Sequence, residues 1–163
     1  MFKFNKRKGI TLITLIAIIT VSIILTSTIV ISYSSFKTSA KKKSFAMELY
    51  TLELQIKEYK MHNNTYPINQ KKEFDINVLD SKLLTIMEQL GEEISQGKVE
   101  LYTIDFNKIN INSLVRGVEK DGELDVYVYS TKTHNLYYLK GEEIENNIYY
   151  YFDDELYNIL KIK

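Results

Sequence analysis

Few residues in this chain could carry out chemistry. The 163 residues include two histidines, His62 and His134, and no cysteine. Neither histidine has the close spacing to a second ligand that metal sites show. We interpret His62 as a surface residue at a helix end and His134 as one in a hairpin loop. The sequence therefore predicts no catalytic residue, no cofactor and no metal.

One acidic run, Asp153-Asp154-Glu155, could hold a cation loosely. It lacks the alternating oxygen ligands and the turn glycine of a calcium-binding loop, so we interpret it as a solvated acidic face. No phosphate-binding loop, nucleotide fingerprint, zinc motif or nucleophile elbow is found either. The sequence indicates a protein that is not an enzyme, whose function depends on what its helices and strands bind.

The charges are unevenly distributed, although the formal net charge is zero. The first eight residues contain four basic residues and no acidic one. From Ala46 onward, 13 basic and 21 acidic residues give a net charge of −8. Because a negatively charged surface repels phosphate, no direct contact with nucleic acid is expected.

A long apolar segment follows the basic start. No charged residue lies between Lys8 and Lys37, and 15 of the 22 residues in 10–31 are apolar. About 20 such residues span a hydrocarbon core that is about 30 Å thick. A secretory signal peptide has a shorter apolar core of about 7–15 residues. The segment therefore predicts a membrane-spanning helix rather than a secretory signal peptide, and a plain signal anchor is one interpretation of it.

The segment KRKGITLITLIAIITVSIILTSTIV resembles the N-terminus of type IV prepilins and pseudopilins. The match consists of a basic tripeptide, residues 6–8, then Gly9, Ile10 and an aliphatic stretch. In that family a membrane aspartyl peptidase cleaves after the glycine and methylates the new N-terminus. The resemblance implies cleavage between Gly9 and Ile10 and N-methylation of Ile10. Without a side chain, glycine lets the backbone lie extended in a protease cleft.

Thr14 stands where the family usually has a glutamate, five residues after the glycine. In the family that carboxylate is thought to pair with the N-terminal amine of a neighbouring subunit, and an unpaired charge in lipid is costly. Members that lack the glutamate are mostly minor subunits. The resemblance therefore implies a minor pilin, and the alternative is that Thr14 is one more tolerated hydroxyl in the helix.

The helix is expected to continue beyond the apolar segment, to about Met61. Five residues with helical spacing of 4, 3, 4 and 3 predict a stripe that packs against a globular head. They are Phe45, Leu49, Leu52, Ile56 and Tyr59. Asn63, Asn64 and Pro67 then favour a helix end. The run EYKMHNNTYP also resembles the family, in which the long helix often ends in a similar sequence.

The rest of the chain predicts short elements. Helical spacing indicates a helix over residues 76–94, and a final helix could form over residues 153–162. Strands are predicted over residues 99–106, 109–119, 123–130 and 136–140, with a tight turn at Asp121-Gly122. Alternation in residues 123–130 predicts a half-buried strand. The tyrosines of residues 149–151 could form a contact surface or cover the sheet.

Taken together, these patterns predict an α+β, pilin-like fold. A long N-terminal helix, with a transmembrane half and an amphipathic half, would pack on an antiparallel sheet of three to four strands. The predicted parts are a leader (1–9), a transmembrane or filament-core half (10–33), an amphipathic half (34–62) and a globular head (63–163).

The resemblance implies a minor pilin or pseudopilin that is assembled through its N-terminal helix into a type IV pilus or related filament. Adhesion, motility, secretion and DNA uptake all remain open. Expected partners are the membrane, other pilin subunits, the prepilin peptidase and, indirectly, the assembly platform and its ATPase. The expected location is a single-pass membrane protein with an extracytoplasmic head, later a cell-surface filament. The alternative is a signal-anchored receptor-like or sensory binding protein.

Overall fold

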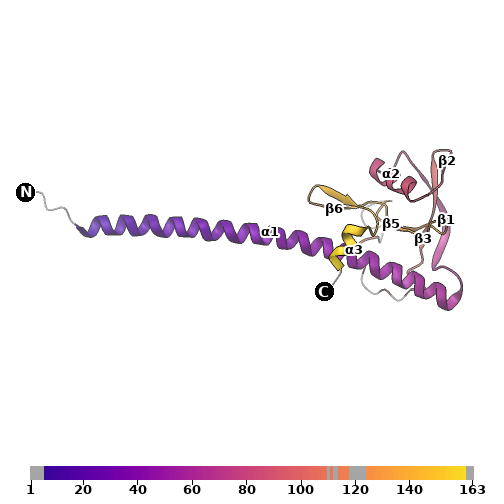
Figure 1. Ribbon diagram of the computed structural model, residues 1–163, viewed down its shortest axis with the longest axis horizontal. Helices are drawn as coiled ribbons and strands as arrows, with labels where there is room; N and C mark the ends of the chain where they lie inside the picture. Colours follow the sequence, from indigo (N-terminus) through magenta and orange to yellow (C-terminus); the bar gives the residue numbers. More distant parts are fainter. Residues whose placement is uncertain (1–5, 110, 112–113, 118–123, 161–163) are drawn as a thin grey trace, which may run out of the picture. The chain divides into compact units, whose positions relative to one another are not determined.

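The computed structural model describes residues 6–109, 111, 114–117 and 124–160. The chain divides into two compact units, Met1–Ala40 and Lys41–Lys163. Helix α1, Lys6–Asn63, begins in the first unit and ends in the second (Figure 1). The predicted turn at Asp121-Gly122 and part of the predicted strand over residues 109–119 lie outside the described residues.

The end of α1 is set by backbone geometry. Asn64 has a φ of 55°, and its N–H donates to the carbonyl of Lys60 at 2.9 Å. This left-handed conformation satisfies a carbonyl at the end of the helix, and asparagine tolerates it better than most residues. Pro67 follows three residues later and cannot continue a helix.

The second unit contains an antiparallel five-stranded sheet. Four strands lie in the order β1-β3-β4-β5, and the short β2 also pairs with β3. The bounds are β1, Ile68–Asp75; β2, Ile94–Ser95; β3, Lys98–Ile104; β4, Tyr127–Tyr129; and β5, Leu136–Tyr138. A separate hairpin joins β6, Glu142–Ile144, to β7, Asn147–Tyr149, and two short helices are α2, Ser81–Gln89, and α3, Asp154–Leu160.

Each face of the sheet contributes to a different hydrophobic cluster. Tyr127 and Tyr129 of β4 pack in one cluster with residues from the C-terminal part of α1. Val126 and Val128, which alternate with these tyrosines, pack in the other with residues of α2. The sheet therefore lies between two helical layers, and Figure 1 shows α2 and the end of α1 on opposite sides of the strands.

The predicted fold class is wrong, and so is the predicted location as a single-pass membrane protein. Among the described residues, no helix combines the length and the apolarity needed to cross a membrane. Hydroxyl-bearing residues such as Thr20, Ser22 and Thr26 interrupt the apolar side chains there. The sheet is also larger than three to four strands and is covered on both faces, because β1 and β2 add to it and α2 packs on the second face.

Several shorter elements also differ from the sequence-based expectation. The helix predicted over residues 76–94 is α2 alone, because Asp80 caps its N-terminus by accepting the N–H of Lys82 at 2.7 Å. Gly91, with a φ of 86°, follows its C-terminus. The strand predicted as half-buried is buried on both faces in β4. β1 was missed because its outward side chains are charged, so the sequence lacks an apolar alternation.

Candidate interaction surfaces

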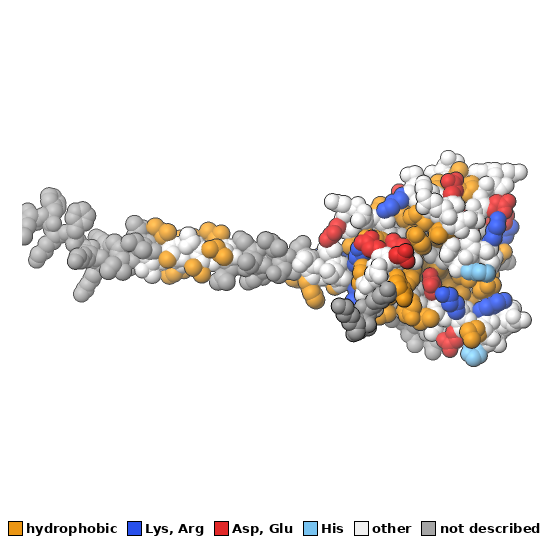
Figure 2. Space-filling view, viewed as in Figure 1, with side chains coloured by type: hydrophobic (Ala, Val, Ile, Leu, Met, Phe, Trp, Pro, Cys, Tyr) orange, Lys and Arg blue, Asp and Glu red, His pale blue; other side chains and the backbone are white. Residues whose placement is uncertain are grey.

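The described part of the first unit exposes many large apolar side chains. Seven aliphatic residues between positions 15 and 24 are 49–63% exposed. They are Leu15, Ile16, Ile18, Ile19, Val21, Ile23 and Ile24. Tyr33 and Phe36 are 68% and 72% exposed. Figure 2 shows such hydrophobic side chains along this unit. Contiguous apolar surface of this extent marks an interaction site.

The polar side chains among these residues are satisfied within the helix. The hydroxyl of Thr20 donates to the carbonyl of Ala17 at 2.9 Å, and that of Ser22 donates to the carbonyl of Ile18 at 2.8 Å. Thr26 donates in the same way to the carbonyl of Ser22. Because these three hydroxyls already have partners, this described part of the helix can be buried against an apolar neighbour without leaving them unsatisfied.

The residues that resemble a processing site lie at the start of α1. The backbones of Gly9 and Ile10 are helical, and the side chain of Ile10 lies outside what the structure describes. Thr14 is exposed in the same helix. The structure offers no test of cleavage after Gly9 or of methylation of Ile10, so both stay predictions.

In the second unit, α1 has a buried face and an exposed face. Phe45, Leu49, Leu52 and Ile56 are 0–1% exposed and belong to the cluster under β4 and β5, and Tyr59 packs against that cluster. The other face exposes Met47 at 44%, Tyr50 at 40% and Leu54 at 45%, with spacings of three and four residues. These three residues form an exposed apolar stripe of the kind that another helix can cover.

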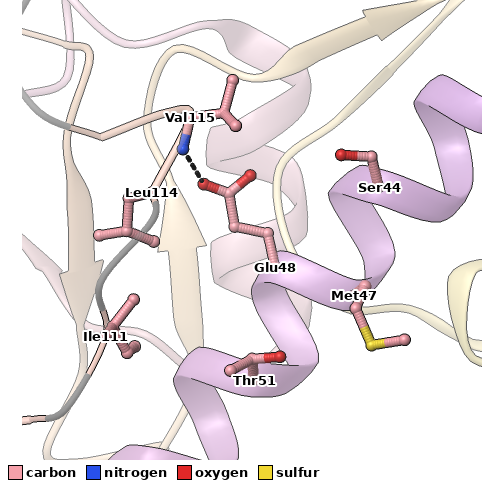
Figure 3. A pocket seen from close by; sticks show the side chains of 7 residues that line it. All are labelled: Ser44, Met47, Glu48, Thr51, Ile111, Leu114 and Val115. Atoms are coloured by element: carbon pink, nitrogen blue, oxygen red, sulfur yellow. Dashed lines mark hydrogen bonds between the residues drawn. The ribbon is translucent and has the colours of Figure 1, made fainter.

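A groove opens between α1 and the segment that precedes β4. It has a volume of about 270 Å³ and is lined by Ser44, Met47, Glu48, Thr51, Ile111, Leu114 and Val115. Figure 3 shows the segment beside the helix, with Glu48 reaching from α1 toward the backbone N–H of Val115. Val115 is 74% exposed, whereas Ile111 and Leu114 are partly buried. The groove is thus an apolar recess with a carboxylate in its wall.

A buried ion-pair network lies beside this groove. Arg116 Nη1 donates to Glu48 Oε2 at 2.6 Å, and Arg116 Nε donates to Glu142 Oε2 at 2.6 Å. The three side chains are only 8–12% exposed. The other oxygen of Glu48 accepts the backbone N–H groups of Val115 and Arg116 at 3.1 Å, and Lys41 pairs with Glu142 at 2.9 Å. The network therefore joins α1, the groove segment and β6.

These contacts stabilise the ionised forms. Burial opposes the positive charge of Arg116, but hydrogen bonds to Glu142 and Glu48 outweigh it and raise the pKa of Arg116. Burial likewise opposes ionisation of Glu142, yet the hydrogen bonds from Arg116 and Lys41 lower the pKa of Glu142 below its usual value. Breaking the network would leave buried charges without compensation.

The other candidates from the sequence lie at the surface or make local contacts within the described residues. His62 is exposed near the end of α1. His134 is exposed in the β4–β5 turn, where its Nδ1 lies 3.2 Å from the hydroxyl of Tyr66. Asp153 caps α3 by accepting the N–H of Leu156 at 2.8 Å, and Glu155 pairs with Lys42. Across the described part of the chain, no cluster of three or more potential ligands could hold a metal ion.

Glu92 is a buried acid that the sequence analysis did not single out. Its carboxylate accepts hydrogen bonds from Ser130 Oγ at 2.8 Å and the hydroxyl of Tyr137 at 2.9 Å, and also from Thr133 Oγ1. These contacts fix the β4–β5 turn against the C-terminal end of α2. Arg116 was missed in the same way, since each residue acts through partners that are distant in the sequence and no periodic pattern marks them.

Comparison with known proteins adds no relative. No family model matches the chain, and no match is found among curated proteins or among solved structures. Function must therefore be inferred from the residues and surfaces described above.

Proposed function

We propose that this chain is a subunit of a type IV pilin-like filament, processed after Gly9 and assembled through its N-terminal helix. The observation that supports this proposal best is the exposed apolar surface of residues 15–24 in α1. Burial of apolar surface is worth about 25 cal/mol per Å², so a neighbouring helix that covered these residues would stabilise an assembly. The hydroxyls that bond within the helix, such as Thr20 and Ser22, make this surface suitable for dry packing.

The N-terminal sequence supplies the second line of support. A basic leader, Gly9 and an aliphatic run stand in the order found in prepilins. Thr14, in place of the usual glutamate, favours a minor subunit over the major one. The stripe of Met47, Tyr50 and Leu54 adds a second apolar face, in the other unit, that a neighbouring subunit could cover.

The proposal is tested by the mature N-terminus and by the location of the protein. Mass spectrometry of protein from sheared surface filaments should find chains that begin at Ile10 and carry one methyl group on the amine. Replacing Gly9 with valine should abolish cleavage, because the branched side chain prevents close approach of the peptidase backbone. Asn5→Val, in the same leader, is the matched control and should be cleaved normally.

Two results would count against the proposal. One is a chain that keeps Met1 in cells that process other prepilins. This result would favour the alternative, a signal-anchored receptor-like or sensory binding protein, which is not processed after Gly9. The other is a correctly processed chain that is absent from the filaments. Quantifying copies per filament tests the minor-subunit assignment, since a minor subunit is far less abundant than the main one.

A further inference from the structure

We propose that a second pocket, at the edge of the sheet, binds an uncharged sugar, either free or as one unit of a glycan. The pocket lies within the second unit and has a volume of about 310 Å³. Small-molecule sites usually have volumes of about 300–1,000 Å³. The lining residues that carry the argument are Glu93, Ser95, Glu100, Tyr102, Thr131 and Lys132. The inference goes beyond the proposed filament subunit and does not depend on it.

The pocket lies at a gap in the strand pairing. On the edge of β3 opposite β1, β2 pairs with residues 98–99 and β4 pairs with residues 102–103. The described pairings on this edge skip residues 100–101. Ser95 of β2 and Thr131, which follows β4, line the pocket on the two sides of this gap. A gap of two residues is too short for a peptide to add as a strand, so the site suits a compact ligand.

The charges of the pocket already have partners within the chain. Glu93 pairs with Lys132 at 2.7 Å, and Glu100 pairs with Lys71. Glu92 is 8% exposed, and its carboxylate accepts three side-chain hydroxyls. The carboxylates repel an anion, and no group of three described ligands could hold a metal ion. Because every lining residue also carries a polar group, the pocket favours an uncharged polar ligand over an apolar one.

The paired groups keep hydrogen-bonding capacity for such a ligand. A carboxylate has about four acceptor sites and an ammonium group has three donors. The contact between Glu93 and Lys132 uses one of each, so acceptors and donors remain on the same rim. The hydroxyls of Ser95 and Thr131 add groups that both donate and accept. Sugar hydroxyls also donate and accept, so they match both kinds of group.

Tyr102 adds an aromatic ring to this polar lining. Its backbone lies opposite Lys71 of β1 and Tyr129 of β4, so the position that carries the ring is fixed before a ligand arrives. The face of an aromatic ring is negative and attracts C–H groups. A sugar ring presents C–H groups on its faces and hydroxyls around its rim. A ring beside donors and acceptors therefore selects a sugar over a molecule with polar groups alone.

Saturation-transfer NMR on the purified full chain tests the proposal. The probes are glucose, galactose, mannose and N-acetylglucosamine, each also as its methyl glycoside. At least one should bind with a Kd of about 1 mM, because a single ring in a surface pocket makes few contacts. Tighter binding of the methyl glycoside identifies a glycan as the source of the sugar, and tighter binding of the free form identifies a free sugar.

Substitutions assign the binding to this pocket. Tyr102→Ala should weaken it at least tenfold, whereas Tyr102→Phe keeps the ring and should bind almost as well as the natural chain. Lys132→Met removes a donor and breaks only an exposed ion pair, so it should fold normally and bind several-fold more weakly. Tyr157→Ala, at a tyrosine 47% exposed in α3, is the matched control and should leave binding unchanged.

Three results would overturn the inference. The first is that none of the uncharged sugars binds at about 10 mM. The second is unchanged binding in Tyr102→Ala or, if that variant does not fold, in Lys132→Met. The third is tenfold tighter binding of glucosamine, glucuronate or a blocked neutral dipeptide than of the uncharged sugars. None of these measurements concerns cleavage or filaments, so the proposed function would stand in each case.

Discussion

Arg116 is the residue whose removal gives the sharpest test of the reasoning about the buried network. Arg116→Met roughly keeps the side-chain volume but removes the guanidinium, whose central carbon lies 5.2 Å from the centre of the Phe45 ring. It leaves Glu48 and Glu142, whose side chains are 8% and 12% exposed, without their shared cation. Breaking a buried pair by removing one partner costs about 3–5 kcal/mol, because the remaining charge is desolvated and uncompensated.

That cost is large relative to the stability of a domain, which is typically about 5–15 kcal/mol. A loss of about 3–5 kcal/mol lowers the folding equilibrium constant roughly a hundredfold to a few thousandfold. For a chain of this size, the midpoint of thermal unfolding should fall by about 6–20 °C. Urea unfolding of the full chain, followed by tyrosine fluorescence, measures this loss because eight of the 13 tyrosines lie between Tyr127 and Tyr157.

Two comparisons separate the charge effect from a packing effect. Adding Glu48→Gln and Glu142→Gln to Arg116→Met should recover most of the lost stability, because no buried charge then remains in that group. Lys132→Met breaks the exposed pair with Glu93 and should change stability little. If Arg116→Met unfolded at the same urea concentration as Lys132→Met, the network would not be the buried charge cluster that we describe.

The pH dependence of stability provides a further check on the same network. The folded pKa of Glu142 is lowered, so its contribution is fully present above the unfolded value of about 4.3 and is lost as the pH falls through the folded pKa. The natural protein should therefore lose stability below about pH 4. Arg116→Met lacks the main cation that lowers the pKa of Glu142, so the stability of this variant should fall less over the same range.

Three other predictions concern packing and ionisation in the second unit. Leu49→Ala should lower the free energy of unfolding, measured in urea, by about 2–5 kcal/mol because Leu49 is fully buried. Leu54→Ala, at a position 45% exposed on the same helix, should lower it far less. Equal losses would contradict the assignment of the buried face. Gly117→Ala should be more destabilising than Gly97→Ala. Both positions have a positive φ, but a Cβ at Gly117 would lie 2.2 Å from Tyr127 Cδ2, whereas one at Gly97 would meet nothing within 4 Å. The difference between the unfolding midpoints of the two variants therefore measures the steric contribution to the destabilisation. Burial raises the pKa values of Tyr127 and Tyr137. The stability that these residues contribute is therefore fully present below the unfolded pKa of about 10 and is lost as the pH rises above it. Ionisation of the tyrosines, measured by absorbance, should coincide with unfolding, and ionisation that preceded unfolding would argue against burial.

The sequence identifies those features that depend on local spacing. Residues such as Phe45 and Leu49 share one face of a helix because their spacing follows 3.6 residues per turn. The cap at Asn64 follows from the conformations that asparagine tolerates. In both cases the physical cause lies within a few residues, so it is visible in a single sequence.

Features that depend on distant partners could not be predicted in this way. β1 is stabilised by pairing with β3, including Phe74 opposite Val99, while its exposed residues Lys71 and Glu73 give no apolar alternation. Glu48, Arg116 and Glu142 meet only once the sheet and α1 are in contact, and no motif relates their positions. Burial of β4 on both faces requires α2 as a second layer, which its alternating sequence does not indicate.

The two faces of α1 in the second unit connect this packing to the proposed function. A helix that served only to hold the sheet would need one apolar face, and Phe45, Leu49 and Ile56 already provide it. Met47, Tyr50 and Leu54 follow the same helical spacing on another face and remain 40–45% exposed. Tyr50 already packs against Phe152, with ring centroids 5.8 Å apart, and covering the exposed parts of the three side chains would bury further apolar surface. Under the proposed function a neighbouring subunit covers this second face, and substitutions on it should then reduce assembly while leaving the stability of the single chain nearly unchanged.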